Sequence, residues 1–450
     1  MRAMPSPPSI LLLPRAAVTC NAAFEVLDSP AVHIEGGAIS YIGPRQAAPP
    51  FEPSETIAGE HLVALPGLIN AHTHAAMTLL RGWADDMPLE AWLQNKIWPF
   101  ERHLREADVV AGFELALLEM LRGGTTCFAD MYFFYERTAQ VLVESGMRGC
   151  PGGVFLGFLP EPERRLDEAI AFARGWQGAG EGRLTPFLAP HSLYTVGRAH
   201  WEKIVAASHE HGLLIHTHVA ETPREIEEVR SQWKTTPVQA LAGLGALEGP
   251  LLAAHAIYLS DTEHELAASQ RGLDGASHFR VAHNPTSNAK LGSGVAPVGK
   301  YLRDGVTVAL GPDGAASNNT LDMWSEMRLA ALLHKAASGD ATLVSAQQAL
   351  LMATREGARA LNLAGRIGSL EAGKRADIVL VDFDKPHLTP CHSVVSHLVY
   401  AARADDVDTV LVDGRVLVRR GQVLALDEER IKRAARASAL ELAAKASATA

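Results

Sequence analysis

Eight short apolar segments recur through the middle of this 450-residue chain, separated by helical stretches such as DVVAGFELALLEMLRGG and RAHWEKIVAASHEHG. The segments are LVALPGLINAH (62–72), TTCFAD (125–130), MRGCPGGVF (147–155), LTPFLAPH (184–191), LLIHTH (213–218), LLAAHA (251–256), FRVAHN (279–284) and VTVALGPD (306–313). Short apolar runs that alternate with helices are typical of parallel sheets in α/β proteins. Eight such units over about 300 residues favour a (β/α)8 barrel of the TIM type over a doubly wound sheet.

The two ends of the chain have a different pattern, in which short β-like runs are separated by turn signals. The N-terminal end contains ILLLPRAAVT and AVHIEGGAISYIG, and the C-terminal end contains VDTVLVDGRVLVRRGQVL with an Asp-Gly turn. We expect the two ends to pair into one small discontinuous β-sandwich domain. The expected division is 1–65 and 366–425 for this domain, 66–365 for the barrel and 426–450 for a C-terminal helix.

Composition and charge exclude several classes of partner. The formal net charge is −10 and no basic run stands out, so we expect neither nucleic acid nor an anionic membrane surface as a partner. No segment approaches 18 uninterrupted apolar residues, and the prolines of MRAMPSPPSILLLPRAAVT argue against a signal peptide. The four cysteines (20, 127, 150 and 391) form no CxxC pair, which is typical of reduced thiols in a cytoplasmic protein.

Polar residues stand where the expected strands end. These residues are His72, His74, His191, His218, His255, His283 and Asp313. One H-x-H pair, or one histidine at a strand end, is common by chance in a chain with 19 histidines. Catalytic residues of TIM-type barrels lie at the carboxyl ends of the strands, so their repetition at several ends indicates a metal site.

Four of these residues form a suitable donor set. His72, His74, His218 and Asp313 supply three nitrogens and one oxygen, a set that suits zinc or iron and leaves room for water. Related two-metal barrels often use a carbamylated lysine on the fourth strand, and LTPFLAPH contains no lysine. We therefore expect one metal ion per chain, with Zn²⁺ preferred and Fe²⁺ as the alternative.

His216 competes with His218, because the two side chains share one face of the same strand. His216 would lie about 6.6 Å deeper, two residues at ~3.3 Å each, so we place it in the barrel interior behind the ligands. Glu221 follows three positions after His218, where a carboxylate can exchange protons with a substrate. A metal-bound water has a pKa lowered toward 7, and His255 and Asp313 are candidates to accept its proton.

Longer motifs carry a resemblance to a known family. PGLINAHTHAAMTLLRG, HVAET, AAHA, HNPTSNAKLGSG and LGPDGAASNN resemble the amidohydrolase superfamily, in its mononuclear, cytosine-deaminase-like branch. Within this branch, HTHAAMTLLRGWADDMPLEAWLQNKIWPFE and LDMWSEMRLAALLHK are similar to the 5-methylthioadenosine/S-adenosylhomocysteine deaminases. The resemblance runs from about residue 60 to about residue 420.

The resemblance implies roles for individual residues. It implies zinc on the four donors above, Glu221 as the proton shuttle to the purine ring and His255 as an aid in activating water. Glu101 matches a residue that binds the ribose hydroxyls, and His191 matches a position in the substrate pocket. Met77 and Trp92 are candidates for the apolar wall around the purine or its 5′ substituent. Arg165 is the candidate partner for the carboxylate of a homocysteine tail.

The implied activity is hydrolytic deamination of an adenine nucleoside: 5′-methylthioadenosine, adenosine or S-adenosylhomocysteine. Pro312 departs from the family, whose members usually have threonine before the ligand aspartate, and it removes a hydroxyl and an N–H there. One rival is the same chemistry on guanine, 8-oxoguanine or a triazine. The other is a binding protein on an inactive barrel, which predicts a missing ligand or a missing Glu221. We expect a homo-oligomer, either a dimer or a tetramer.

Overall fold

Eight parallel strands form the centre of the computed structural model, which describes residues 7–272 and 275–448. The strands are β6 (Leu68–Thr73), β7 (Thr125–Tyr132), β8 (Arg148–Phe155), β9 (Ala189–Pro190), β10 (Ile215–Val219), β11 (Leu251–His255), β12 (Phe279–His283) and β13 (Thr307–Leu310). Parallel bridges join β9 to β10, and the amide of Asp313 donates to the carbonyl of His72 at 3.1 Å, which joins the last strand to the first. The predicted order of strands around one curled parallel sheet is therefore observed.

Three strands differ from their expected bounds by more than two residues. The segment 306–313 forms only β13 (Thr307–Leu310), so that Asp313 lies in the loop after the strand. The segment 62–72 divides at Gly67, where the backbone passes from the terminal sheet (Pro66) to the barrel (Leu68). A side chain at Gly67 would collide with Thr126, so only glycine allows this close approach. The segment 184–191 forms only the two-residue strand β9, because its prolines have no N–H to donate to a neighbouring strand.

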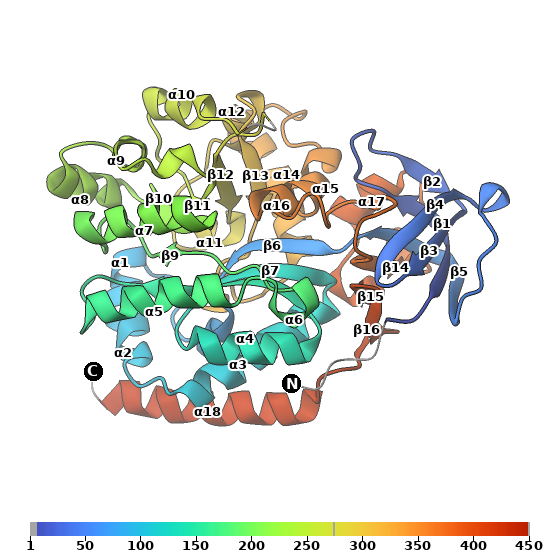
Figure 1. The fold of residues 1–450 in the computed structure, drawn as a ribbon, viewed down its shortest axis with the longest axis horizontal. Coiled ribbons are helices and arrows are strands. Elements are labelled where there is room, and N and C mark those ends of the chain that lie inside the picture. Colours follow the sequence, from blue (N-terminus) through green and yellow to red (C-terminus); the bar gives the residue numbers. More distant parts are fainter. Residues whose placement is uncertain (1–6, 273–274, 449–450) are drawn as a thin grey trace.

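Helices surround the barrel and connect its strands (Figure 1). The longer ones are α3 (Glu106–Arg122), α4 (Tyr135–Ser145), α5 (Pro162–Gly175), α7 (Arg198–His211), α8 (Pro223–Trp233), α10 (Asp261–Ser269) and α14 (Met323–Ser338). The shorter ones are α1 (Leu89–Trp92), α2 (Trp98–Glu101), α6 (Ala179–Gly182), α9 (Pro237–Gly243), α11 (Pro285–Lys290), α12 (Val298–Arg303), α13 (Ala315–Asn318), α15 (Ala346–Met352) and α16 (Arg355–Ala360). A 3₁₀ helix, η2 (Ala75–Leu80), and a π-helical turn, η3 (Leu93–Ile97), also belong to this layer, and α17 (Val394–Tyr400) packs against α14 and α15.

Strands from both chain ends form a second sheet beside the barrel (Figure 1). They are β1 (Ile10–Val18), β2 (Val26–Asp28), β3 (Pro30–Glu35), β4 (Ala38–Pro44), β5 (Glu55–Pro66), β14 (Ile378–Asp382), β15 (Val407–Val412), β16 (Arg415–Arg419) and β17 (Gln422–Val423). Antiparallel pairing of β5 with β14 joins the two ends, and the predicted Asp-Gly turn between β15 and β16 is confirmed. All nine strands belong to one hydrogen-bonded sheet; the two-layer sandwich stays a prediction.

A buried ion-pair cluster holds this sheet to the barrel. Arg148 of β8 contacts Asp377 at 2.7 Å and Asp413 at 2.6 Å, and all three side chains are at most 2% exposed. A buried arginine needs such partners, because an unpaired charge is costly to remove from water. Removal of either partner would therefore loosen the junction between the two sheets.

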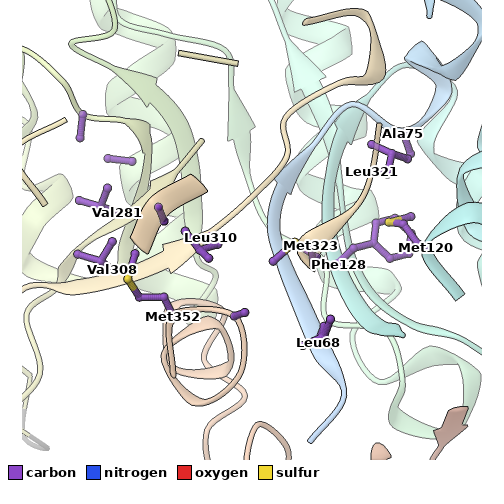
Figure 2. Packing of buried hydrophobic residues seen from close by; sticks show 14 of the residues in the cluster. Leu68, Ala75, Met120, Phe128, Val281, Val308, Leu310, Leu321, Met323 and Met352 are labelled. Atoms are coloured by element: carbon purple, nitrogen blue, oxygen red, sulfur yellow. The ribbon is translucent and has the colours of Figure 1, made fainter. Parts of the chain in front are cut away.

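Apolar side chains fill the space between the strands and the outer helices (Figure 2). Phe128 of β7 packs in the same cluster as Met120 of α3, and Val308 of β13 in the same cluster as Met352 of α15. These side chains are at most 1% exposed. Full burial of one such side chain stabilises a fold by about 1.5–3 kcal/mol, so this layer holds the strand ends in a fixed arrangement.

The C-terminal helix α18 (Glu428–Ala448) lies along the outside of α3 (Figure 1). Ala435 and Leu442 of α18 share an apolar cluster with Met77, Trp92 and other residues of η2, α1 and α2. The helix thereby supports the segment between β6 and α3. Within the described ranges, no helix is both long and apolar enough to span a membrane.

Candidate active site

One cavity lies at the carboxyl ends of the barrel strands. His74, His191, His218, Glu221, His255 and Asp313 line its inner end, and Met77, Trp92, Trp98, Glu101 and Tyr132 are among the residues that line its outer part. The strand-end residues of β6, β10 and β11 therefore meet at one point, as a barrel requires. His283 is fully buried, and its Nε2 lies 2.9 Å from Nε2 of His334.

The four expected metal ligands lie close together. Nε2 of His72 and Nε2 of His74 each lie 3.4 Å from Oδ1 of Asp313. The ring centroid of His218 lies 4.9 Å from that of His72 and 5.4 Å from that of His74. One ring nitrogen from each of His72, His218 and His255 also lies within 4.8 Å of the other two. The arrangement brings together nitrogen and oxygen donors from β6, β10 and the loop after β13.

Each histidine of the donor set is oriented through its other ring nitrogen. Nδ1 of His74 donates to the carbonyl of Met131 at 2.7 Å, and Nδ1 of His218 donates to the carbonyl of His191 at 2.8 Å. Nδ1 of His72 lies 3.0 Å from Nε2 of His216. In all three residues Nε2 remains available as the ligand atom. His216 thus lies in the barrel interior behind His72, where the spacing argument places it.

Burial sets the charge states of these groups. It lowers the pKa of His72 to about 4 and holds the pKa of His218 well below its ordinary value, so both imidazoles are neutral. Burial would raise the pKa of Asp313, but the imidazoles of His72, His74 and His255 beside it outweigh burial and hold the pKa well below its usual range. Neutral imidazoles with one carboxylate are the forms that bind a divalent metal.

The donor set fits a zinc ion. Nε2 of His72 is buried and has no hydrogen-bond partner among the described residues, which is costly unless the atom has a ligand. Ligand atoms of a tetrahedral zinc at ~2.0 Å lie roughly 3.3 Å apart. The two distances of 3.4 Å from Asp313 to His72 and His74 match this separation. The other carboxylate oxygen of Asp313 accepts hydrogen bonds from Ser287 and Ser317.

Glu221 and His255 face each other beside the donor set. Oε2 of Glu221 lies 3.7 Å from Nε2 of His255, while Nδ1 of His255 donates to Oδ1 of Asn288 at 2.8 Å. Burial raises the pKa of Glu221 above its ordinary value, so it can bind and release a proton at moderate pH. Burial alone would lower the pKa of His255, but Glu221, Asp313 and Asn288 together raise it.

One segment, residues 284–293, holds three of the candidate residues. Ser287 donates to Asp313 at 2.7 Å, Asn288 accepts from His255, and Ser293 donates to Glu221 at 3.1 Å. The segment follows β12 and includes helix α11. Sequence reasoning did not assign these roles, although the quoted motif HNPTSNAKLGSG contains all three residues. Their hydrogen bonds depend on loops that only the folded chain brings together.

The outer part of the cavity is lined by residues that the sequence predicts to contact a nucleoside. Oε1 of Glu101 accepts a hydrogen bond from the hydroxyl of Tyr132 at 2.8 Å, and burial raises the pKa of Glu101 to about 7. Met77 and Trp92 are 7% and 4% exposed and contribute to the apolar wall. At the inner end, the ring of His191 stacks on that of His218 with centroids 4.6 Å apart. Tyr132 is a site residue that the sequence did not reveal.

Arg165 is not brought to this cavity. Its guanidinium Nε donates to the carbonyl of Pro160 at 2.8 Å on the protein surface, and the residue does not line the cavity. A second hollow adjoins the mouth, where Leu93, Trp98 and Phe158 face Glu225 and Glu228. Phe158 is 61% exposed there. The role of Arg165 toward a homocysteine carboxylate stays a prediction from the sequence.

Comparison with known proteins agrees with this geometry. The family model described as the amidohydrolase family matches residues 63–417, which include every barrel strand. The chain belongs to the amidohydrolase family. Its members are hydrolases, and the relatives reported below are named as deaminases, so the chain is an enzyme that acts on C–N bonds.

Three relatives extend the comparison. The chain is 47% identical over 412 residues to a 5-methylthioadenosine/S-adenosylhomocysteine deaminase of Pelotomaculum thermopropionicum, covering 91% of this chain and 93% of that one. It is 44% identical over 420 residues to a 5′-deoxyadenosine deaminase of Methanosarcina acetivorans, covering 93% and 94%. Among solved structures, an adenosine deaminase from Xanthomonas campestris with bound zinc has a TM-score of 0.92 at 36% identity, covering 98% of this chain and 99% of that one.

Proposed function

We propose that this enzyme is a zinc-dependent deaminase of adenine nucleosides. The observation that carries the proposal is a buried carboxylate, Glu221, which lies 3.7 Å from His255 in the same cavity as the candidate metal ligands. Proton transfer to a purine ring requires a carboxyl group close to the site where water is activated, and Glu221 occupies such a position. The rival reading as an inactive binding protein predicts a missing ligand or a missing Glu221, and both are present.

His72, His74, His218 and Asp313 would hold one zinc ion per chain. When bound, zinc supplies Lewis-acid activation of water near neutral pH. His216, Met131 and the backbone of His191 keep the three imidazoles oriented through their Nδ1 atoms. The absence of a lysine on the fourth strand supports a single metal, because no bridging carbamate can form there.

Glu221 is proposed to carry the proton. Its Oε2 gives a proton to N1 of the adenine ring, while His255 and Asp313 accept the proton that the attacking water loses. A C6–O bond forms. The amino group then takes up the proton held by His255 and Asp313 and leaves as ammonia as the C6–N bond breaks, while the proton of the new C6 hydroxyl returns to Oε2 of Glu221. The products are the hypoxanthine nucleoside and ammonia, so no nucleophilic serine or cysteine is needed. His255 keeps Nε2 toward this reaction because Nδ1 donates to Asn288.

Glu101 is proposed to bind the ribose hydroxyls, with Tyr132 fixing one of its oxygens. His191, Met77 and Trp92 are proposed to contact the base or the 5′ side of the nucleoside. The relatives named above act on 5-methylthioadenosine, S-adenosylhomocysteine, 5′-deoxyadenosine and adenosine, which share the adenine ring and differ at the 5′ carbon. We propose that this chain accepts the same group of small molecules.

The test is a panel of substrates. Zinc-loaded protein should release ammonia from 5′-methylthioadenosine or adenosine and form the hypoxanthine nucleoside, measured by chromatography. S-adenosylhomocysteine, guanine, 8-oxoguanine and a triazine complete the panel. Activity on guanine or a triazine, with none on any adenine nucleoside, would refute the proposal.

The remaining expectations from the sequence are also proposals. We propose a cytoplasmic enzyme that assembles as a dimer or tetramer. We propose that residues 1–65 and 366–425 form one β-sandwich domain, which the pairing of β5 with β14 supports. Size-exclusion chromatography with light scattering tests the assembly.

A further inference from the structure

We infer that Ser293 is a positioning residue for Glu221. Its hydroxyl holds Oε1 of the carboxylate, so that Oε2 is the oxygen that exchanges the proton with the substrate. The inference rests on the proposed function for the role of Glu221, and it adds a residue that was not among the candidates from the sequence.

The contact itself is buried and specific. Oγ of Ser293 donates to Oε1 of Glu221 at 3.1 Å, and the two residues are 3% and 8% exposed. The other oxygen, Oε2, faces Nε2 of His255 at 3.7 Å. The two carboxylate oxygens therefore have different surroundings: one has a fixed donor, and the other faces the reacting groups.

The loop around Ser293 is built to place this hydroxyl. Glycines stand on both sides of it with φ of +66° and +125°, values that other residues rarely adopt. A Cβ atom at Gly294 would lie 2.8 Å from the hydroxyl oxygen of Tyr258, which would have to move, and the φ of +125° would strain any other residue there. The amide of Ser293 donates to the carbonyl of Asn288 at 2.9 Å. The glycines thus permit the turn, and this hydrogen bond ties the backbone of Ser293 to helix α11.

The backbone of Glu221 is held separately. The carboxylate of Glu225, near the start of helix α8, accepts from the amides of Ala220 and Glu221 at 2.8 and 2.7 Å. Ala220 has a left-handed φ of 54°, which turns the chain at this point. With the backbone fixed in this way, the remaining freedom of Glu221 is rotation of its side chain, and the hydrogen bond from Ser293 limits that rotation.

The chemistry follows from the direction of the hydrogen bond. An oxygen that accepts from a hydroxyl is a poorer place for a proton than one that does not. The proton that Glu221 gains and loses therefore belongs on Oε2, next to His255. Ser293 donates to Oε1 whether Glu221 is ionised or neutral, so no bond to Ser293 forms or breaks during the reaction.

The first experiment compares Ser293→Ala with wild type on 5′-methylthioadenosine and adenosine. Loss of one hydrogen bond to a charged group should lower kcat about 10-fold or more, with KM within threefold and the zinc content unchanged. Ser293→Thr keeps the hydroxyl and should recover most of kcat. Ser287→Ala is the matched control, a buried serine of the same segment that contacts Asp313 instead; it should lower zinc affinity.

The second experiment tests whether Ser293 acts through Glu221. In the Glu221→Gln background, the further change Ser293→Ala should lower kcat by less than threefold, because the step that Ser293 assists is already lost. An equal loss in both backgrounds, or normal kcat in Ser293→Ala, would overturn the inference. Failure of the wild-type protein to deaminate any adenine nucleoside would instead refute the proposed function. Thermal unfolding of all variants separates either result from misfolding.

Discussion

The two ends of the active-site cavity are built differently. At the inner end, the donor residues stand on or directly after strands, and each has a second hydrogen-bond partner behind it. His72 is 0% exposed and Asp313 is 6% exposed. At the outer end, short helices between β6 and α3 supply Trp92, Trp98 and Glu101, and apolar packing holds them. Phe158 at the mouth is largely exposed.

The difference separates chemistry from substrate choice. Strand ends of a closed barrel cannot shift independently. The positions of the candidate metal ligands and Glu221 are therefore fixed by the barrel as a whole. Short helices held by apolar contacts tolerate substitutions of similar volume. Changes at the inner end should therefore alter metal retention and kcat, whereas changes at the outer end should alter KM for particular nucleosides.

The largest expected effect is at the inner end. Glu221→Gln keeps the shape of the side chain but removes the group that transfers the proton, a contribution of typically 10²–10⁴-fold. We expect kcat to fall at least a hundredfold while zinc content, measured by elemental analysis, stays near one ion per chain.

His218→Ala, three residues earlier on β10, provides the contrast, and it should lose the zinc itself. Two tightly held metal ions in the wild type, or full activity of Glu221→Gln, would contradict the assignment of the inner end.

A smaller effect is expected behind the ligands. His216→Ala removes the partner of Nδ1 of His72, and loss of such a partner weakens metal binding by about 10–100-fold. Titration with a zinc chelator measures the change. Activity should return when zinc is added in excess, because no ligand atom is lost. A variant that never regains zinc would mean that His216 is itself a ligand.

At the outer end, Glu101→Gln should raise KM for ribonucleosides by about 10-fold, the scale of a hydrogen bond to a charged group, with kcat nearly unchanged. A 2′,3′-dideoxy substrate should be affected little, since it has no hydroxyls for Glu101 to bind. An equal loss on both substrates would show that Glu101 serves the fold.

The raised pKa of Glu101 predicts that kcat/KM depends on pH through the outer end of the cavity. Burial raises the pKa to about 7, so the carboxylate is neutral below that pH and ionised above it. A carboxylate accepts ribose hydroxyls better when ionised, so kcat/KM should rise with pH, with a midpoint at about 7 and a plateau above it. Glu101→Gln should remove this rise. Tyr132→Phe removes a hydrogen bond that lowers the pKa, so the midpoint should move upward.

The smallest effect is expected at Arg165. The side chain is exposed and outside the cavity, so Arg165→Ala should change kcat/KM by less than twofold for both 5′-methylthioadenosine and S-adenosylhomocysteine. A selective loss for S-adenosylhomocysteine of ~1.5–3 kcal/mol would instead restore the role expected from the sequence.

The sequence alone predicted the order of the elements and named the candidate metal donors. Alternating strands and helices predicted the parallel sheet, because hydrophobic periodicity reflects local burial. The histidines of each HTH motif (72–74 and 216–218) are two positions apart. Each pair was therefore predicted to share one face of its strand, because side chains alternate along a strand. The spacing also predicted that His216 lies in the barrel interior behind the donors. The contact between Nε2 of His216 and Nδ1 of His72 agrees with this prediction.

Only the tertiary structure decided the contacts between distant segments. The partners of Glu221, His255 and Asp313 come from residues 284–293, 26 to 72 positions away in the chain. The division of one expected strand at Gly67 follows from contact with Thr126, and the exposed position of Arg165 follows from the path of the loop before α5. Hydrogen bonds between loops leave no periodic trace in a sequence, because each depends on where the whole barrel brings the two backbones.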